Sequence, residues 1–239
     1  MKDKRIFFNP IRMLSPKVDS EAVKIEELHK SPVSETFTLE EGLLVMLSKV
    51  IEMTRLINLS FVSASINEVH SAEALAREVH ELEKLLTENL ACAITDPPDM
   101  CRAVILFPSH LERVGDYLES ILNCCRIRCQ YSVPLTDEAV SEVEDIFKLV
   151  LEIMGNFRDA FIRPNKVLLE NVVNESKRLD QICHNLELSH VERLLNGSTA
   201  PRASSLYLDI LESTKSMNRH IRDMAAQIRS LMTEIENIA

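Results

Sequence analysis

Six stretches of apolar residues, spaced alternately three and four positions apart, constrain the fold of this chain more than any other feature. In the first stretch these positions are Leu43, Leu47, Val50, Thr54, Ile57 and Phe61. This spacing places the side chains on one side of an α-helix and is typical of helices packed in bundles. Five further stretches lie at 75–89, 104–125, 143–161, 168–186 and 210–231. The sequence therefore predicts an all-α protein with six long helices.

Residues that begin or end helices separate these stretches. Thr38 followed by Glu41 forms a capping box at the start of the first helix, and Thr136 is expected to cap the fourth. Proline pairs or single prolines interrupt the chain at 96–99, 134 and 163–165, and Asn196-Gly197-Ser198 is expected to end the fifth helix. The chain has only four glycines, which suits long helices joined by short loops.

The last three helices repeat the pattern of the first three. An offset of 100 places Leu43 on Val143 in the first and fourth helices, and the same offset relates the second and fifth. An offset of 103 places Val114 on Met217 in the third and sixth. We therefore expect two tandem pseudo-repeated antiparallel three-helix bundles, at residues 38–132 and 133–239.

An irregular N-terminal arm, residues 1–37, is expected to precede the bundles, with room for a short helix at 20–30. Its basic residues surround Ile6, Phe7 and Phe8, which suits either a membrane-surface or partner-docking arm or a mobile tail. The chain carries a net charge of −10, which argues against nucleic acid as a partner. Because no sustained apolar run suggests a membrane span or a signal peptide, we expect a cytoplasmic protein.

The third helix carries an acidic stripe on the side away from its apolar residues. Glu112 and Asp116 are four residues apart and share a face, and Glu119 and Asn123 fall on the same stripe. Their oxygen atoms suit a hard metal ion, although a solvated helix face has the same pattern. Gly115 lies beside the pair, and a glycine inside a helix is favoured where a ligand or another backbone comes close.

The six cysteines leave two interpretations open. Cys125 and Cys129 are one helical turn apart and could bind a metal as thiolates, or all six are reduced residues that help to fill the core. The sequence has no glycine-rich phosphate loop and no residues arranged for nucleophilic catalysis. We therefore expect that the protein is not an enzyme.

The segment Leu111-Glu112-Arg113-Val114-Gly115-Asp116 resembles the signature helix of PhoU-type phosphate-regulatory proteins. The resemblance covers about 38–238. In the second half, the segments 190–194, 207–211 and 217–220 resemble most the PhoU-like cytoplasmic tail of bacterial sodium/phosphate cotransporters. The family resemblance implies a fold of two three-helix bundles, in agreement with the repeat.

The resemblance also implies metal binding through Glu/Asp-x-x-x-Asp motifs on each bundle. Glu112 and Asp116 match that motif, and the further ligands expected are Glu119 on the same helix and His80, Glu81 and Glu83 on the second helix. The metal would be Fe, Zn, Mn or Mg, as a divalent or trivalent ion. In the second bundle, the offset places Lys215 on Glu112 and Arg219 on Asp116, so we expect a metal site on the first bundle only. Glu175 is expected to pair with Lys215 or Arg219.

The function implied by the resemblance is regulation of phosphate transport or phosphate signalling. Such a regulator would dock on a phosphate transporter subunit or a sensor kinase, form a homodimer, and associate peripherally with the membrane through the transporter. Two alternatives stay open at this point. One is a metal-dependent phosphohydrolase with a multi-metal acidic cluster, and the other is a metal-free helical interaction scaffold.

Overall fold

The computed structural model describes residues 39–93 and 105–238, and the regular elements in these ranges are all α-helices. They are α3 (Leu39–Ser63), α4 (Ile66–Ala93), α6 (Phe107–Tyr131), α7 (Asp137–Ile162), α8 (Lys166–Leu195) and α9 (Pro201–Ile238). The predicted all-α fold is confirmed. The N-terminal arm, its short helix and the break at 96–99 lie outside the described residues. No described helix is long and apolar enough to cross a membrane.

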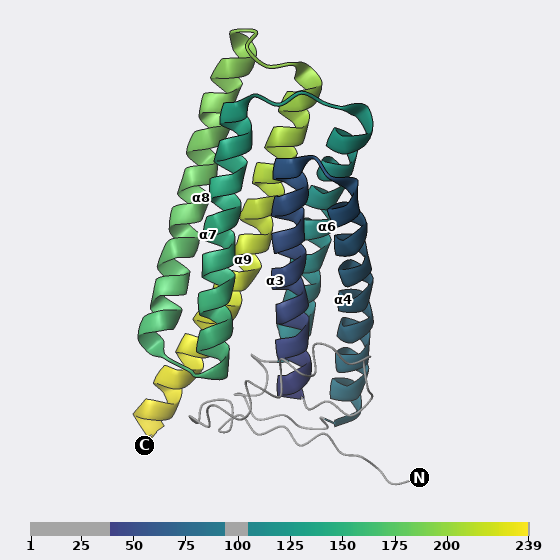
Figure 1. The fold of residues 1–239 in the computed structure, drawn as a ribbon. Coiled ribbons are helices and arrows are strands. Elements are labelled where there is room, and N and C mark those ends of the chain that lie inside the picture. The colour runs from purple at the N-terminus through teal and green to yellow at the C-terminus, as the bar shows by residue number, and fades with distance from the viewer. Residues whose placement is uncertain (1–38, 94–104, 239) are drawn as a thin grey trace.

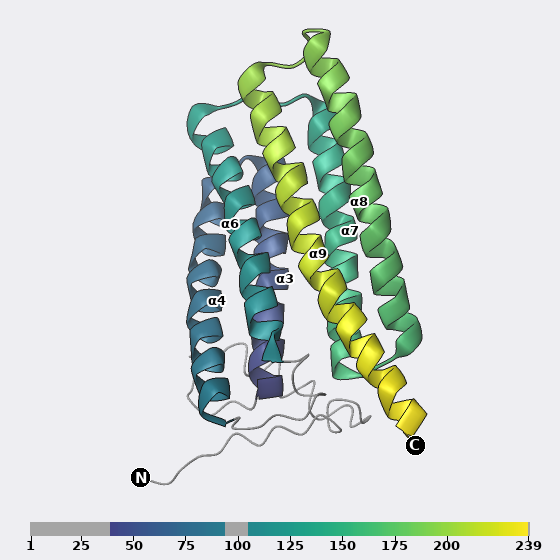
Figure 2. The same cartoon turned by 180° about the vertical axis from the view of Figure 1, so that it is seen from behind.

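The helices form two three-helix bundles, α3–α4–α6 and α7–α8–α9, that lie side by side (Figure 1). Consecutive helices are joined by short loops where the chain is described, and they run antiparallel. The bundles meet along two pairs of helices. One pair is α3 with α7, seen in Figure 1, and the other is α6 with α9, seen in Figure 2. The remaining helices, α4 and α8, form the two outer edges.

Local hydrogen bonds and backbone conformation explain the expected starts of α7 and α8 and the end of α8, whereas Thr38, the expected cap of the first helix, lies outside the described residues. The Thr136 hydroxyl accepts a hydrogen bond from the backbone N–H of Ala139 at the start of α7, at 3.2 Å. The Asn165 side chain accepts from the first turn of α8 in the same way. Gly197, directly after the α8 cap, has a φ of +71°, the left-handed conformation that glycine adopts without strain.

Some residues related by the repeat offsets of 100 and 103 contact each other across the two bundles. Thr54 of α3 donates a hydrogen bond to the Met154 sulfur of α7 at 3.6 Å, and these residues are 100 apart. The rings of Tyr117 on α6 and His220 on α9, 103 apart, stack with their centroids 5.9 Å apart. A residue can contact its own equivalent only near a twofold axis. These two contacts therefore place a pseudo-twofold axis through the joint between the bundles and support both offsets.

The apolar seams of the described helices form one continuous core across both bundles. Equivalent positions are buried alike: Val114 and Met217 are both completely buried, as are Leu118 and Ile221 to within 1%. Burial of these seams against one another, by the hydrophobic effect, holds the six helices together.

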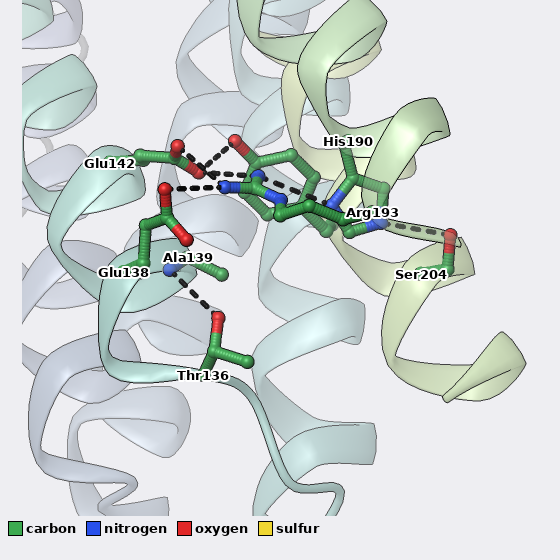
Figure 3. A network of polar contacts seen from close by, with 8 residues as sticks. Thr136, Glu138, Ala139, Glu142, His190, Arg193 and Ser204 are labelled. Atoms are coloured by element: carbon green, nitrogen blue, oxygen red, sulfur yellow. Dashed lines mark hydrogen bonds and ion pairs between the residues drawn. The ribbon is translucent and has the colours of Figure 1, made fainter. Parts of the chain in front are cut away.

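A partly buried polar network ties the three helices of the second bundle together near one end (Figure 3). The Arg193 guanidinium of α8 donates to both carboxylate oxygens of Glu142 on α7, at 2.9 and 2.8 Å. The Tyr207 hydroxyl of α9 donates to the same carboxylate at 2.5 Å. His190 stacks on Tyr207 and lies 2.9 Å from the Ser204 hydroxyl. Two segments singled out by the family resemblance, 190–194 and 207–211, thus meet in the structure.

The network predicts a pH-dependent contribution from Glu142 to stability. Burial raises the pKa of Glu142, but the hydrogen bonds from Arg193 and Tyr207 outweigh it, so the pKa lies below its ordinary value. A depressed carboxyl pKa stabilises the fold above its unfolded-state value, about 4.3, and the effect is lost as the pH falls through the folded pKa. We expect Glu142→Gln to lower the free energy of unfolding by about 2 kcal/mol at pH 7. Urea unfolding should show this difference shrinking below about pH 4.

The control is Glu144→Gln, which removes an acid from the same helix that pairs with Lys148 on the surface. Because exposed ion pairs contribute little, this variant should change the unfolding free energy by less than about 1 kcal/mol at pH 7. A Glu142→Gln effect that stays constant from pH 7 to pH 3 would contradict the assignment.

Candidate metal centre

The predicted acidic pair lies on the side of α6 that borders α4. Glu112 and Asp116 are one helical turn apart, and their side chains retain 28% and 36% of their exposure. They are only partly exposed because α4 packs against this side of α6. The acidic stripe therefore lines the boundary between two helices and is not a fully solvated face.

His80 of α4 lies among these acids. Its Nδ1 atom is 3.8 Å from Glu112 Oε1, and its Nε2 atom is 3.3 Å from Glu119 Oε1. One ligand atom each from His80, Glu112 and Asp116 can be chosen so that all three lie within 4.8 Å of one another. Two ligands bound to one metal at about 2.0–2.2 Å can be at most about 4.4 Å apart, so small side-chain movements would complete a three-ligand site.

The other predicted ligands lie around this group without joining it. Glu119 contacts His80, and Glu83 accepts a hydrogen bond from the Thr87 hydroxyl at 2.8 Å. Glu83 is still close enough to Glu112 for its charge to act there. Glu81 is exposed. The structure thus brings His80, Glu112 and Asp116 together, with Glu119 and Glu83 at their edge, and metal binding by any of them stays a prediction.

The electrostatics of the group favour a cation. The pKa of Glu112 is raised, first by burial and then by the negative charges of Asp116 and Glu83, while Arg113 and His80 lower it by less. The ionised cluster therefore repels itself in the free protein. A bound metal ion would relieve that repulsion, because it supplies the positive charge that the surrounding side chains only partly provide.

Close packing of two helices explains the glycine at position 115, with no ligand involved. A Cβ atom at this buried position would lie 3.2 Å from Cγ1 of Val79 on α4. The glycine thus allows α4 and α6 to approach closely. Since His80 follows Val79 directly, this approach also brings the imidazole to the acids. The sequence favours a ligand or another backbone beside Gly115, whereas the close neighbour in the structure is the Val79 side chain.

The equivalent place in the second bundle holds ion pairs. Lys215, at the position of Glu112, pairs with Glu187 and Glu212, both at 2.7 Å. Asp180 takes the place of His80 and pairs with Arg222, which takes the place of Glu119. The histidine–carboxylate contact of the first bundle thus recurs as a carboxylate–guanidinium contact. Because basic side chains already neutralise its acids, this site is not expected to bind a cation.

The expected partner of Glu175 was wrong. Glu175 pairs with Arg178, three residues along its own helix, at 2.9 Å. The sequence reasoning also missed the Glu187–Lys215 and Asp180–Arg222 pairs. The repeat offsets could have found the second of these, since adding 100 to 80 and 103 to 119 gives 180 and 222.

The burial of the described cysteines supports the interpretation that they help to fill the core. Burial raises the pKa of Cys124 to about 11 and that of Cys125 to about 12. Metal binding needs a thiolate, and both thiols hold their protons firmly at neutral pH. Cys129 is only partly buried, one turn beyond Cys125.

A shallow groove adjoins the candidate centre. It has a volume of about 430 Å³ and runs along α4 and α6 next to Glu119. Its lining includes Arg77 and Arg126, and Arg126 pairs with Glu73. The first bundle therefore offers a charged depression beside the acidic group on the same pair of helices.

Residues 43–125 match the family model of the PhoU domain. This range covers most of the first bundle, about a third of the chain. The matched range contains His80, Glu112 and Asp116. No curated protein sequence matches the chain.

Two solved PhoU structures have the same fold. PhoU from Pseudomonas aeruginosa is 18% identical, with a TM-score of 0.75 over 82% of this chain and 96% of that one. The phosphate transport system regulatory protein PhoU from Streptococcus pneumoniae is 15% identical, with a TM-score of 0.72 over 89% of this chain and 97% of that one. Both matches extend over both bundles, so the second half of the chain shares the PhoU fold as well.

If this centre binds metal, a double variant that removes its two carboxylates should lose the thermal stabilisation by metal but not the stability of the metal-free protein. Glu112→Gln with Asp116→Asn removes the mutual repulsion, so the metal-free variant should unfold at a temperature equal to or slightly above that of the wild-type protein. Adding Mn²⁺ at one hundred times its Kd should raise the wild-type midpoint by about 5–10 °C and leave the variant unchanged. Thermal unfolding after chelator treatment measures both effects. An equal Mn²⁺ shift in wild type and variant would exclude this centre.

Proposed function

We propose that this chain is a PhoU-like regulator of phosphate transport or phosphate signalling, with a metal ion on its first bundle. The observation that carries the proposal is the convergence of His80, Glu112 and Asp116 within the residues that match the PhoU domain. The fold is shared with a Streptococcus pneumoniae protein whose name describes it as a phosphate transport system regulatory protein. The metal is Fe, Zn, Mn or Mg, bound by the imidazole and the two carboxylates, with Glu119 and Glu83 available as further ligands.

The protein would act as a scaffold that docks on a phosphate transporter subunit or a sensor kinase. The acidic group and the adjoining groove lie together on α4 and α6, and both are accessible from outside. A metal held by only three protein ligands keeps open coordination positions, which a partner's side chain can fill. In this proposal the protein works in the cytoplasm as a homodimer and reaches the membrane only through the transporter.

We propose a binding role and not catalysis. Among the described side chains of residues 39–88 and 105–234, only His80, Glu112 and Asp116 form a group of three metal-ligand side chains. Hydrolysis of phosphate esters by a multi-metal mechanism needs a second ion about 3.5–4 Å from the first, with its own ligands. One group of three side chains suits one ion, which favours a bridging role for it.

The proposal is tested by measuring binding of the full chain to the phosphate transporter subunits and sensor kinases of its own genome. We expect one of these partners to bind the metal-loaded protein. Glu112→Gln with Asp116→Asn, or removal of the metal, should weaken that binding at least tenfold.

The matched control is Glu144→Gln with Asp145→Asn, which removes two exposed acids that pair with Lys148 on the second bundle. It makes the same change in net charge and should alter the affinity less than twofold. Equal weakening by the two double variants would mean that bulk charge, and not the metal centre, drives docking.

Turnover of a phosphate monoester separates the regulator from the hydrolase. We expect the metal-loaded protein to release no more phosphate from p-nitrophenyl phosphate than the chelator-treated protein does. Chelator-sensitive turnover that disappears in the Glu112→Gln variant would support the phosphohydrolase alternative.

A further inference from the structure

Two histidines from different bundles meet at the joint between α6 and α9. The Nδ1 atoms of His110 and His220 lie 3.0 Å apart, and the ring centroids are 5.2 Å apart at an interplanar angle of 63°. Both side chains are partly buried. His110 lies two residues before Glu112, but it reaches the opposite bundle, whereas Glu112 reaches α4. The pair is therefore a separate cluster from the acidic centre.

The spacing of the two nitrogens suits a shared cation. Zinc binds imidazole nitrogen at about 2.0–2.1 Å, so two such ligands at angles between about 90° and about 109° lie about 2.8–3.4 Å apart. The observed 3.0 Å falls within that range. Without a metal, one ring donates a hydrogen to the other. With both Nδ1 atoms unprotonated, a cation about 2.0–2.1 Å from each nitrogen would take the place of this hydrogen bond.

The surroundings hold the rings in place and supply an acid. Tyr117 stacks on His220 and limits the rotation of that ring. Asp223, one turn after His220 on α9, lies close enough for its negative charge to act on both histidines. Arg113 and Arg219 place positive charge near His220, and Arg113 pairs with Asp116 at 3.5 Å.

We propose that His110 and His220 form a second metal site, which binds a late first-row divalent cation such as Zn²⁺ and joins the two bundles. Imidazole ligands suit zinc, nickel and copper, whereas magnesium prefers oxygen ligands. Water would complete the coordination of the cation, and the nearby negative charge of Asp223 would favour binding. Since each bundle contributes one imidazole, the site exists only when α6 and α9 are packed together, and the bound cation stabilises that packing.

The site differs from the acidic centre in ligand type and in position. The acidic centre has two carboxylates and one imidazole within the first bundle, and the histidine pair bridges the two bundles. Each site can therefore be removed without touching the ligands of the other. The proposal holds whether or not the acidic centre binds metal and whether or not the protein regulates phosphate transport.

The test uses the full chain with Glu112→Gln and Asp116→Asn, so that zinc bound at the acidic centre does not contribute. Calorimetric titration of this background with Zn²⁺ should show one site per chain. Zinc at one hundred times its Kd should raise the unfolding midpoint by about 5–10 °C. Adding His110→Gln or His220→Gln should weaken zinc binding at least tenfold, and Mg²⁺ should give no shift.

The matched control is His184→Gln, which removes a histidine on α8 that pairs with Glu187 on the surface. This variant should bind zinc as the background does. Asp223→Asn leaves both rings in place and should also weaken zinc binding. It therefore keeps the proposal testable if either His variant fails to fold. The proposal is overturned if the background binds no zinc. It is also overturned if the His184→Gln control loses as much affinity as the His110 and His220 variants, or if Asp223→Asn and the folded His variants bind zinc unchanged.

Discussion

Packing of apolar seams across the joint between the bundles is the interaction on which the rest of the structure depends. The core is continuous through α3 with α7 and α6 with α9, so neither bundle buries its seams alone. The contacts of Thr54 with Met154 and of Tyr117 with His220 show that the joint follows a pseudo-twofold axis. With both helices of each pair fixed in register, the outer sides of α6 and α9 are held in defined positions against α4 and α8.

The two halves share this apolar packing, but they differ in the charged side chains that surround it. Core positions such as Val114 and Met217 stay apolar in both. Around them, the His80–Glu119 contact of the first bundle becomes the Asp180–Arg222 pair of the second. Burial constrains the inner positions because a polar side chain there would be costly, whereas the outer positions are free to change. The first bundle therefore has an acidic group that suits a cation, and the second has ion pairs that are already neutral.

The sequence predicted the features that depend on spacing along the chain. Apolar periodicity gave the helices, the offsets of 100 and 103 gave the repeat, and the i, i+4 acids with His80 gave the candidate centre. It was less successful for contacts between helices. The partner expected for Glu175 lies across the bundle, whereas Glu175 pairs with Arg178 on its own helix. The His110–His220 contact joins positions that the repeat does not relate, so only the packing of α6 on α9 reveals it.

The central claim is that the acidic group of the first bundle binds a metal and that its counterpart in the second does not. Anomalous X-ray diffraction from crystals grown with Mn²⁺ tests this claim most directly. The predicted result is an anomalous peak within about 2.5 Å of ligand atoms from His80, Glu112 and Asp116, with none beside Asp180 and Lys215. A map with no peak at the first bundle, or with a peak at the second alone, would contradict the claim.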